Sequence, residues 1–153
     1  GEQELADQRV VLDALRRGTE LCDDEAEAHS AYGVALLATG QKDEAIVALA
    51  RAVEIDVGSA PRHGNLGTVY LMRGRVPEAI EEYEVQVEIA PRDAMAHADL
   101  GAALLAGGDV ARGAKELEQA VAAEPTRATF RTNLGYALLL QGKLAESEAQ
   151  HRE

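Results

Sequence analysis

The sequence contains one cysteine, Cys22, so no disulfide can form within the chain. A single thiol fits a cytoplasmic setting and leaves the periplasm open. No apolar run approaches the roughly 18 residues that a membrane-spanning helix requires. Residues 1–25 are charged throughout, unlike a signal peptide. We therefore predict neither a disulfide framework nor insertion into a membrane.

Basic side chains are also scarce. The chain has 15 Lys and Arg residues against 27 Asp and Glu residues, which gives a formal net charge of −12. Nucleic acids and anionic membranes both require clustered Lys and Arg, so neither is a predicted partner. The acidic surplus is expected to lie mainly on a solvated surface, with attraction of a basic partner as the alternative.

Aromatic residues make up only 3% of the chain, while Ala and Leu dominate its 46% hydrophobic content. This composition argues against a β-sandwich, which is rich in β-branched and aromatic residues. It favours helices that pack closely through small side chains. The excess of Arg over Lys, together with abundant Ala, is typical of a GC-rich bacterial genome.

What the sequence does contain is a pair of glycines that recurs four times at a constant step. The step is about 34 residues, and a fixed period of this size indicates a repeat architecture. The first glycine of each pair lies in an apolar helical segment, where Gly costs roughly 0.5–1 kcal/mol relative to Ala, so we expect a close helix contact there. The second is expected to end the helix with a positive φ. The pairs are Gly33 and Gly40, Gly67 and Gly74, Gly101 and Gly108, and Gly135 and Gly142.

The period predicts an all-α chain of helix pairs, which in the third unit span about 94–106 and 110–123. Residues 1–25 are expected to form a helix whose second half overlays the second helix of a unit. The fourth unit is expected to turn at Gly142. Because both ends fall inside the repeat pattern, we expect one continuous domain that is a fragment of a longer protein. The predicted units are 26–59, 60–93, 94–127 and a partial fourth, 128–153.

The residues at fixed positions of these units resemble the tetratricopeptide repeat. The second unit shows the pattern most fully, with His63, Leu66, Gly67, Tyr70, Ala79, Tyr83 and Pro91. The resemblance implies a right-handed superhelical solenoid whose first helices line a concave groove. It also implies that the small residues Ala45, Ala79, Gly113 and Ser147 face the packing glycines Gly33, Gly67, Gly101 and Gly135.

In tetratricopeptide proteins the groove usually holds a segment of a partner protein. Packing between helices is the alternative role for the leucines in the middle of the groove, namely Leu37, Leu71 and Leu105. The resemblance assigns these residues to the groove: Ala31, Val34, Leu37, Asn65, Thr68, Leu71, Met72, Ala98, Asp99, Ala102, Leu105, Asn133, Tyr136 and Leu139.

Relatives that grip the carboxylate at the C-terminus of chaperones use a clamp of Lys, Asn and Arg. Asn65 and Asn133 are present, but no groove position of the first three units carries Lys or Arg. The sequence therefore predicts no carboxylate clamp. The small, apolar groove floor favours an amphipathic helix or an extended apolar strip of a protein or peptide partner.

Two other modes of interaction remain open. Four acidic residues on the second helix of the second unit, Glu78, Glu81, Glu82 and Glu88, form either a solvated convex surface or a docking patch for a folded partner, such as a small GTPase or an assembly component. Terminal repeats without caps expose apolar surface, so stacking into a homo-oligomer is the second alternative.

No pattern in the chain indicates catalysis, a metal or a cofactor. His29, His63 and His97 recur once in each of the first three units, but equivalent positions of stacked helices lie roughly 8–10 Å apart, too far to share one ion. Cys22 lies beside acidic residues, which disfavour the reactive thiolate. The glycine pairs lack the spacing of a phosphate-binding loop. We therefore predict a non-catalytic interaction scaffold or adaptor.

Overall fold

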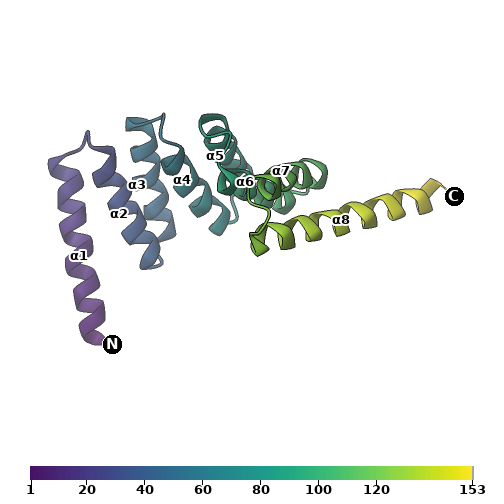
Figure 1. The fold of residues 1–153 in the computed structure, drawn as a ribbon. Coiled ribbons are helices and arrows are strands. Elements are labelled where there is room, and N and C mark those ends of the chain that lie inside the picture. The colour runs from purple at the N-terminus through teal and green to yellow at the C-terminus, as the bar shows by residue number, and fades with distance from the viewer. Residues whose placement is uncertain (153) are drawn as a thin grey trace. The chain divides into compact units, whose positions relative to one another are not determined.

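The computed structural model describes residues 1–152, and the side chains of residues 1–145 and 149. Within these residues the secondary structure is helical and contains no strand (Figure 1), which confirms the all-α repeat prediction. Helices α6 and α7 begin and end at the predicted residues. The helices are α1 (Glu2–Leu21), α2 (Ala26–Ala38), α3 (Lys42–Ile55), α4 (Ala60–Met72), α5 (Val76–Ile89), α6 (Ala94–Ala106), α7 (Val110–Ala123) and α8 (Ala128–Arg152).

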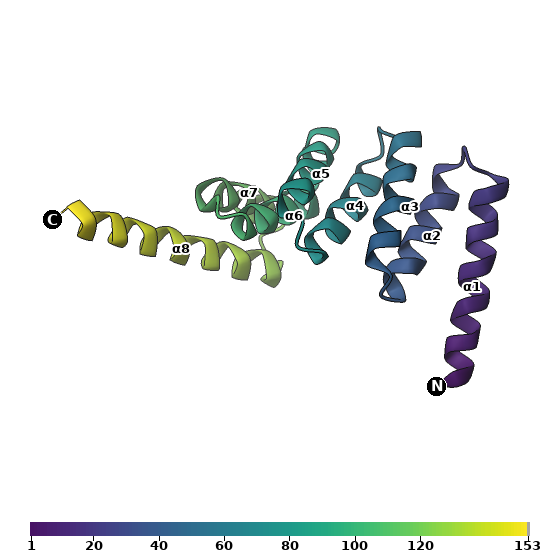
Figure 2. The ribbon, with the colours of Figure 1, turned by 180° about the vertical axis from the view of Figure 1, so that it is seen from behind.

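The helices form two compact units, and the boundary between Glu82 and Tyr83 falls inside α5. In the first unit α1 packs on α2, α2 on α3, and α3 on α4 (Figures 1 and 2). In the second unit α6 packs on α7, and both contact α8. Within each unit these helices therefore contact mainly their neighbours in the sequence, as expected for a repeat protein.

Each unit has its own core of small and branched aliphatic side chains. Leu36 and Leu49, from the first unit, are 2% and 1% exposed. A Cβ placed at Gly33 would lie 2.6 Å from Cγ of Leu49, so a larger residue would clash. In the second unit a Cβ at Gly101 would lie 2.7 Å from Cγ of Leu117. At both positions the helices approach as closely as the glycine pattern predicts.

Three helices end at glycines with positive φ: Gly40, Gly74 and Gly108 have φ values of 81°, 75° and 86°. At the first of these turns, the N–H of Gly40 donates to the carbonyl of Leu37 at 3.0 Å, and the N–H of Gln41 donates to that of Leu36 at 2.9 Å. This pair of bonds is a Schellman motif, which satisfies the last carbonyls of the helix. The same bonds close the other two turns.

The predicted turn at Gly142 is wrong, because α8 continues through it to Arg152. Extending an existing helix adds a hydrogen bond per residue, whereas a short separate helix must nucleate again. The side chain of Ser147, predicted to face Gly135, lies outside the described residues.

The packing role predicted for Gly135 is also wrong. Among the described residues, nothing lies within 4 Å of a Cβ built at this position. The reason is the continuous helix, since no second helix folds back to cover this face. Gly67, at the same position of the second repeat, is buried on α4.

Candidate functional site

An open cleft of about 670 Å³ lies beside α2 and α4 in the first unit. Three predicted groove residues, Ala31, Val34 and Asn65, line it together with Ala35 and Ala38. Val34 is 48% exposed, so a branched apolar side chain stands at the surface of the cleft. Such an opening can receive an apolar side chain of a partner, with the Asn65 amide available for hydrogen bonding.

Arg62, which no sequence pattern singled out, lies in the wall of this cleft. Its guanidinium donates to Oγ of Ser30 at 2.6 Å, Oε2 of Glu27 at 3.2 Å and Oδ2 of Asp56 at 3.2 Å. The carbonyl oxygen of Ala26 accepts a further bond at 3.4 Å. The Arg62 side chain is only 17% exposed. Its charge is thus balanced by two carboxylates, and it ties α4 to α2.

The other predicted residues of α4 present a mixed surface. Thr68 is exposed and its hydroxyl donates to the carbonyl of Gly64 at 2.9 Å. Met72 is 51% exposed, whereas Leu71 is half-buried. Of these residues, Met72 offers the most accessible apolar surface.

Three predicted groove residues pack inside the units instead. Ala98 is 5% exposed and belongs to the core of the second unit. Leu37 and Leu105 are half-buried against the core clusters. A Cβ at Gly113 would lie 2.8 Å from Cδ2 of Leu105, so this leucine points towards the second helix of its own pair. The repeat period locates these positions, but helix packing decides which way they point.

In the second unit the exposed predicted residues lie mainly on α8. Tyr136 and Leu139 are 56% and 55% exposed. Asn133, also on α8, and Ala102 on α6 are half-buried. The accessible part of this region is therefore an aromatic and aliphatic surface on α8.

Asp99 on α6 is a half-buried carboxylate. Burial, with added repulsion from Asp93, raises the pKa of Asp99 to about 6. Within the described part of the chain, no hydrogen bond or ion pair engages its side chain. A nearby cation would stabilise the charged form of this carboxylate.

The repeated histidines have a structural role. In the first unit Nε2 of His63 lies 2.7 Å from the carbonyl oxygen of Val57, and Nδ1 lies 2.7 Å from Oε2 of Glu82. Nε2 must donate, because a carbonyl oxygen can only accept. The ring thereby joins the loop before α4 to α5.

His97 repeats this arrangement, with Nε2 at 2.8 Å from the carbonyl of Pro91 and Nδ1 at 2.7 Å from Oε2 of Glu116. Burial alone would lower the pKa of His97, but the bonds to Glu116 and Pro91 outweigh it and raise the pKa. His29 bonds only the loop, with Nε2 at 3.1 Å from the carbonyl of Asp23. The sequence signal for the full arrangement is a Glu 19 residues after the His.

The acidic residues of α5 do not form one free patch. Glu82 is committed to His63, and its side chain is 22% exposed. Glu78 bonds its own backbone N–H and the Nε of Arg75, and these bonds lower its pKa. Of the four acidic residues predicted to form a docking patch, only Glu81 and Glu88 are exposed. One carboxylate oxygen of Glu82 is therefore already bound to His63, and the docking patch stays a prediction that rests mainly on Glu81 and Glu88.

The described residues contain no group of three or more His, Cys, Asp or Glu side chains placed to hold a metal ion. None of their helices is both long and apolar enough to cross a membrane. Cys22 is half-buried after the end of α1.

Comparison with protein families finds two tetratricopeptide repeat models that match the chain. One matches residues 8–61 and 98–151, and the other matches residues 36–104. Together they span all the helices, including the second half of α1. No curated protein sequence matches the chain.

Solved structures show the same fold. A crystal structure of MamA is 18% identical, with a TM-score of 0.83 over 99% of this chain and 95% of that one. Another crystal structure of MamA is 28% identical, with a TM-score of 0.71 over 83% of this chain and 69% of that one. The first repeat domain of Spaghetti (RPAP3), bound to an HSP90 peptide, is 19% identical, with a TM-score of 0.74 over 77% of this chain and 94% of that one.

Proposed function

This chain belongs to the tetratricopeptide repeat family, and we propose that it is a non-catalytic scaffold or adaptor. It binds an apolar or amphipathic segment of a partner protein in the concave groove formed by the first helices of its repeats. The observation that carries this proposal is the cleft of about 670 Å³ that Ala31, Val34 and Asn65 line together. A preformed cleft on packed helices lowers the cost of ordering the partner on binding.

The charges of the groove support a partner segment with a basic rather than an acidic anchor. Arg62 is already balanced by Glu27 and Asp56, so it leaves no free guanidinium for a terminal carboxylate. Asp99 is a half-buried carboxylate without a counter-ion in the described part of the chain. We therefore propose that the cleft beside α2 and α4 takes an apolar segment and no chaperone tail, and that Asp99, in the second unit, selects a Lys or Arg of the partner.

Selection from a random peptide library, followed by calorimetric titration of the selected peptides, tests the proposal directly. Val34→Glu should weaken binding by about tenfold or more, because it places a charge where an apolar side chain docks. Val47→Glu is the matched control, since Val47 is 72% exposed on α3 and does not line the cleft. Equal affinity of the Val34→Glu variant and the native chain would overturn the groove as the binding site.

The preference for a basic anchor has its own test. Asp99→Asn should weaken the binding of peptides that contain Lys or Arg. The affinity for their neutral analogues should stay unchanged. Binding that survives both groove variants but is lost when Glu81 and Glu88 are changed to Lys would indicate a partner on α5 instead. Glu82 is not part of that variant, because its loss would break the bond to His63.

A further inference from the structure

The first repeat lacks the carboxylate that the next two repeats place against their histidine. Glu82 follows His63 by 19 residues and lies 2.7 Å from its Nδ1, and the third repeat has the same bond. The residue 19 positions after His29 is Ala48. Among the described residues no hydrogen bond engages Nδ1 of His29, although this residue is only 8% exposed.

The His29 ring keeps the orientation of the other two rings. Its Nε2 lies 3.1 Å from the carbonyl oxygen of Asp23, six residues earlier, and the second and third repeats have the same contact to their own loops. Because Nε2 is fixed to the loop, Nδ1 faces α3 at Ala48. This buried nitrogen is therefore directed at the position where a carboxylate lies in the other repeats.

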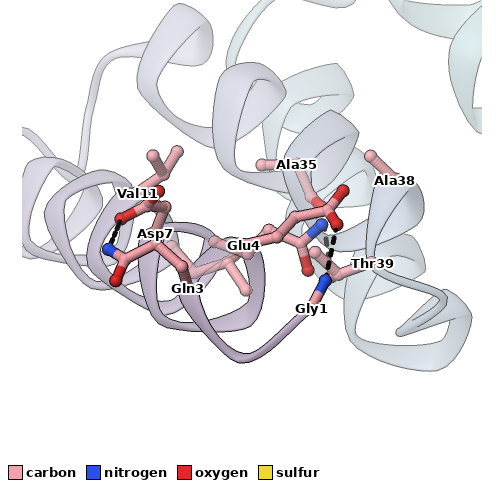
Figure 3. Close-up of a pocket in the computed structure, with 10 residues that line it drawn as sticks. Gly1, Gln3, Glu4, Asp7, Val11, Ala35, Ala38 and Thr39 are labelled. Carbon is pink, nitrogen blue, oxygen red and sulfur yellow. Dashed lines mark hydrogen bonds and ion pairs between the residues drawn. The ribbon is translucent and has the colours of Figure 1, made fainter.

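A cavity of about 370 Å³ lies beside His29 and Ala48. Tyr32 and Leu36 line it from α2, and Thr19 lines it from α1. It shares no lining residue with the cleft beside α2 and α4, or with the larger cavity of about 640 Å³ between α1 and α2 that Figure 3 shows. It is thus a separate site of the first unit, with walls from α1, α2 and α3.

The rim of this cavity is apolar where the next two repeats are charged. Val47 lines the cavity and is 72% exposed. Its counterparts in the second and third repeats are Glu81 and Lys115, which are both exposed. An exposed valine beside a buried polar nitrogen suits a protein segment with an apolar residue next to a polar one.

The charges around the cavity are compatible with an entering carboxylate. Compared with the next two repeats, Asp23 and Arg51 add one charge of each sign, and they pair at 3.5 Å. The bonds of Arg51 are 3.4–3.5 Å long and its side chain is 42% exposed, so it can turn towards an anion. Glu44, the other carboxylate of the lining, corresponds to Glu78, which does not prevent the bond between histidine and glutamate in the second repeat.

We propose that this cavity is a second binding site, and that it receives a glutamate side chain of a partner protein. The partner's carboxylate takes the place that Glu82 has against His63, and the apolar residue beside it contacts Val47. Nε2 of His29 donates to a carbonyl oxygen, so Nδ1 must also carry a hydrogen to donate to a carboxylate. The bound ring is therefore an imidazolium, and binding to the neutral ring takes up one proton.

Titration with sodium acetate, followed by NMR, tests the site, because acetate is the part of a glutamate side chain that Ala48 lacks. Acetate should shift the imidazole signals of His29 with saturation. It should leave those of His63 and His97 unchanged, since each already holds a carboxylate. Several-fold less acetate should be needed at about pH 6 than at about pH 8, because the bound ring is protonated. A native chain without a saturating shift, or with equal shifts at all three histidines, would overturn the proposal.

Ala48→Glu is the variant that fills the site from within the chain. It should abolish the acetate shift at His29 and raise the melting temperature, because the new bond joins α2 to α3 as in the other repeats. Acetate that still binds at His29 in this variant would contradict the position of the site.

A capped Leu-Glu-Leu peptide distinguishes a protein partner from a free carboxylate. It should bind about tenfold tighter than acetate, because its leucines contact the rim, and a Leu-Gln-Leu analogue should bind about tenfold weaker than the peptide. Val47→Glu changes only an exposed side chain and should weaken the peptide by about tenfold. Val34→Glu is the matched control, because Val34 lines the other cleft.

Equal affinity for the peptide and acetate, or unchanged binding in the Val47→Glu variant, would overturn a protein partner at this cavity. Neither result bears on the groove, because the two sites share no lining residue.

Discussion

The pair α6–α7 and helix α8 carry similar residues at the same repeat positions, but only the pair forms a complete core. Leu104 on α6 is 1% exposed, whereas Leu138, its counterpart in the next repeat on α8, is 48% exposed. Leu117 from α7 covers Gly101, while Gly135 is bare among the described residues. A leucine or glycine in the correct register therefore contributes to stability only when a second helix supplies the facing side chain.

The largest expected difference between these regions is in the cost of removing a leucine. Leu104→Ala should lower the free energy of unfolding by about 2–5 kcal/mol, because it leaves a cavity in a packed core. Leu138→Ala should change it by less than about 0.5 kcal/mol, since that side chain is half solvated. Urea denaturation at low protein concentration measures both. Equal losses would mean that α8 is covered in solution as fully as α6.

A substitution of glycine should give effects of opposite sign in the two kinds of helix. Gly33→Ala should destabilise the chain by about 1–3 kcal/mol, because the new Cβ would come within 2.6 Å of Leu49 Cγ. Gly135→Ala should stabilise it by about 0.5–1 kcal/mol, since Ala is the better helix former. The two melting temperatures, compared at a concentration where the chain is monomeric, test this. Loss of stability in both variants would contradict the comparison.

The smallest effect concerns the hydrogen bond between His97 on α6 and Glu116 on α7, which also holds this helix pair together. Because the folded pKa of His97 is raised above its ordinary value of 6.5, its contribution to stability is complete below that pH. It is lost as the pH rises through the folded pKa. Glu116→Gln should cost about 1 kcal/mol near pH 6 and flatten the pH dependence above it.

Measurement of the Glu116→Gln variant needs one control. Asp99 also has a raised pKa, about 6 against an ordinary 3.8, so its contribution to stability is likewise present at low pH and is lost as the pH rises towards 6. Unfolding experiments in an Asp99→Asn background separate the two groups. If Glu116→Gln leaves the remaining pH dependence unchanged, the bond to His97 does not stabilise the fold.

Much of the fold could be predicted from the spacing of glycines and alanines alone. The bounds of α6 and α7 and the positive φ of Gly40, Gly74 and Gly108 follow the repeat register. That register could not predict Gly142, because a turn there depends on whether a second helix gains enough contacts to fold back. It also could not separate Ala98, which is buried, from Val34, which is exposed on the same kind of helix.

The candidate site was less predictable than the fold, since its decisive contacts join residues far apart in the chain. Arg62 looks like one basic residue at the start of α4, yet three side chains on other segments balance and hold it. Glu82 looks like one of several free carboxylates, but a histidine 19 residues earlier binds it. No single helix shows such partners, and only the recurrence of a Glu 19 residues after His63 and His97 indicates the second contact.

By itself the sequence determined the period, the helices and their turns, because helix propensity, apolar spacing and glycine conformation act within a few residues. Only the tertiary structure decided which side chains are free to act. Whether Leu49 covers Gly33, whether Glu82 is already bound and whether Leu104 is buried by a facing helix all depend on surfaces meeting across the fold. Among the described residues, Gly33 and Gly101 are therefore buried and Gly135 is exposed, although all three occupy the same repeat position. Contact between helices, and not the repeat register, buries a glycine.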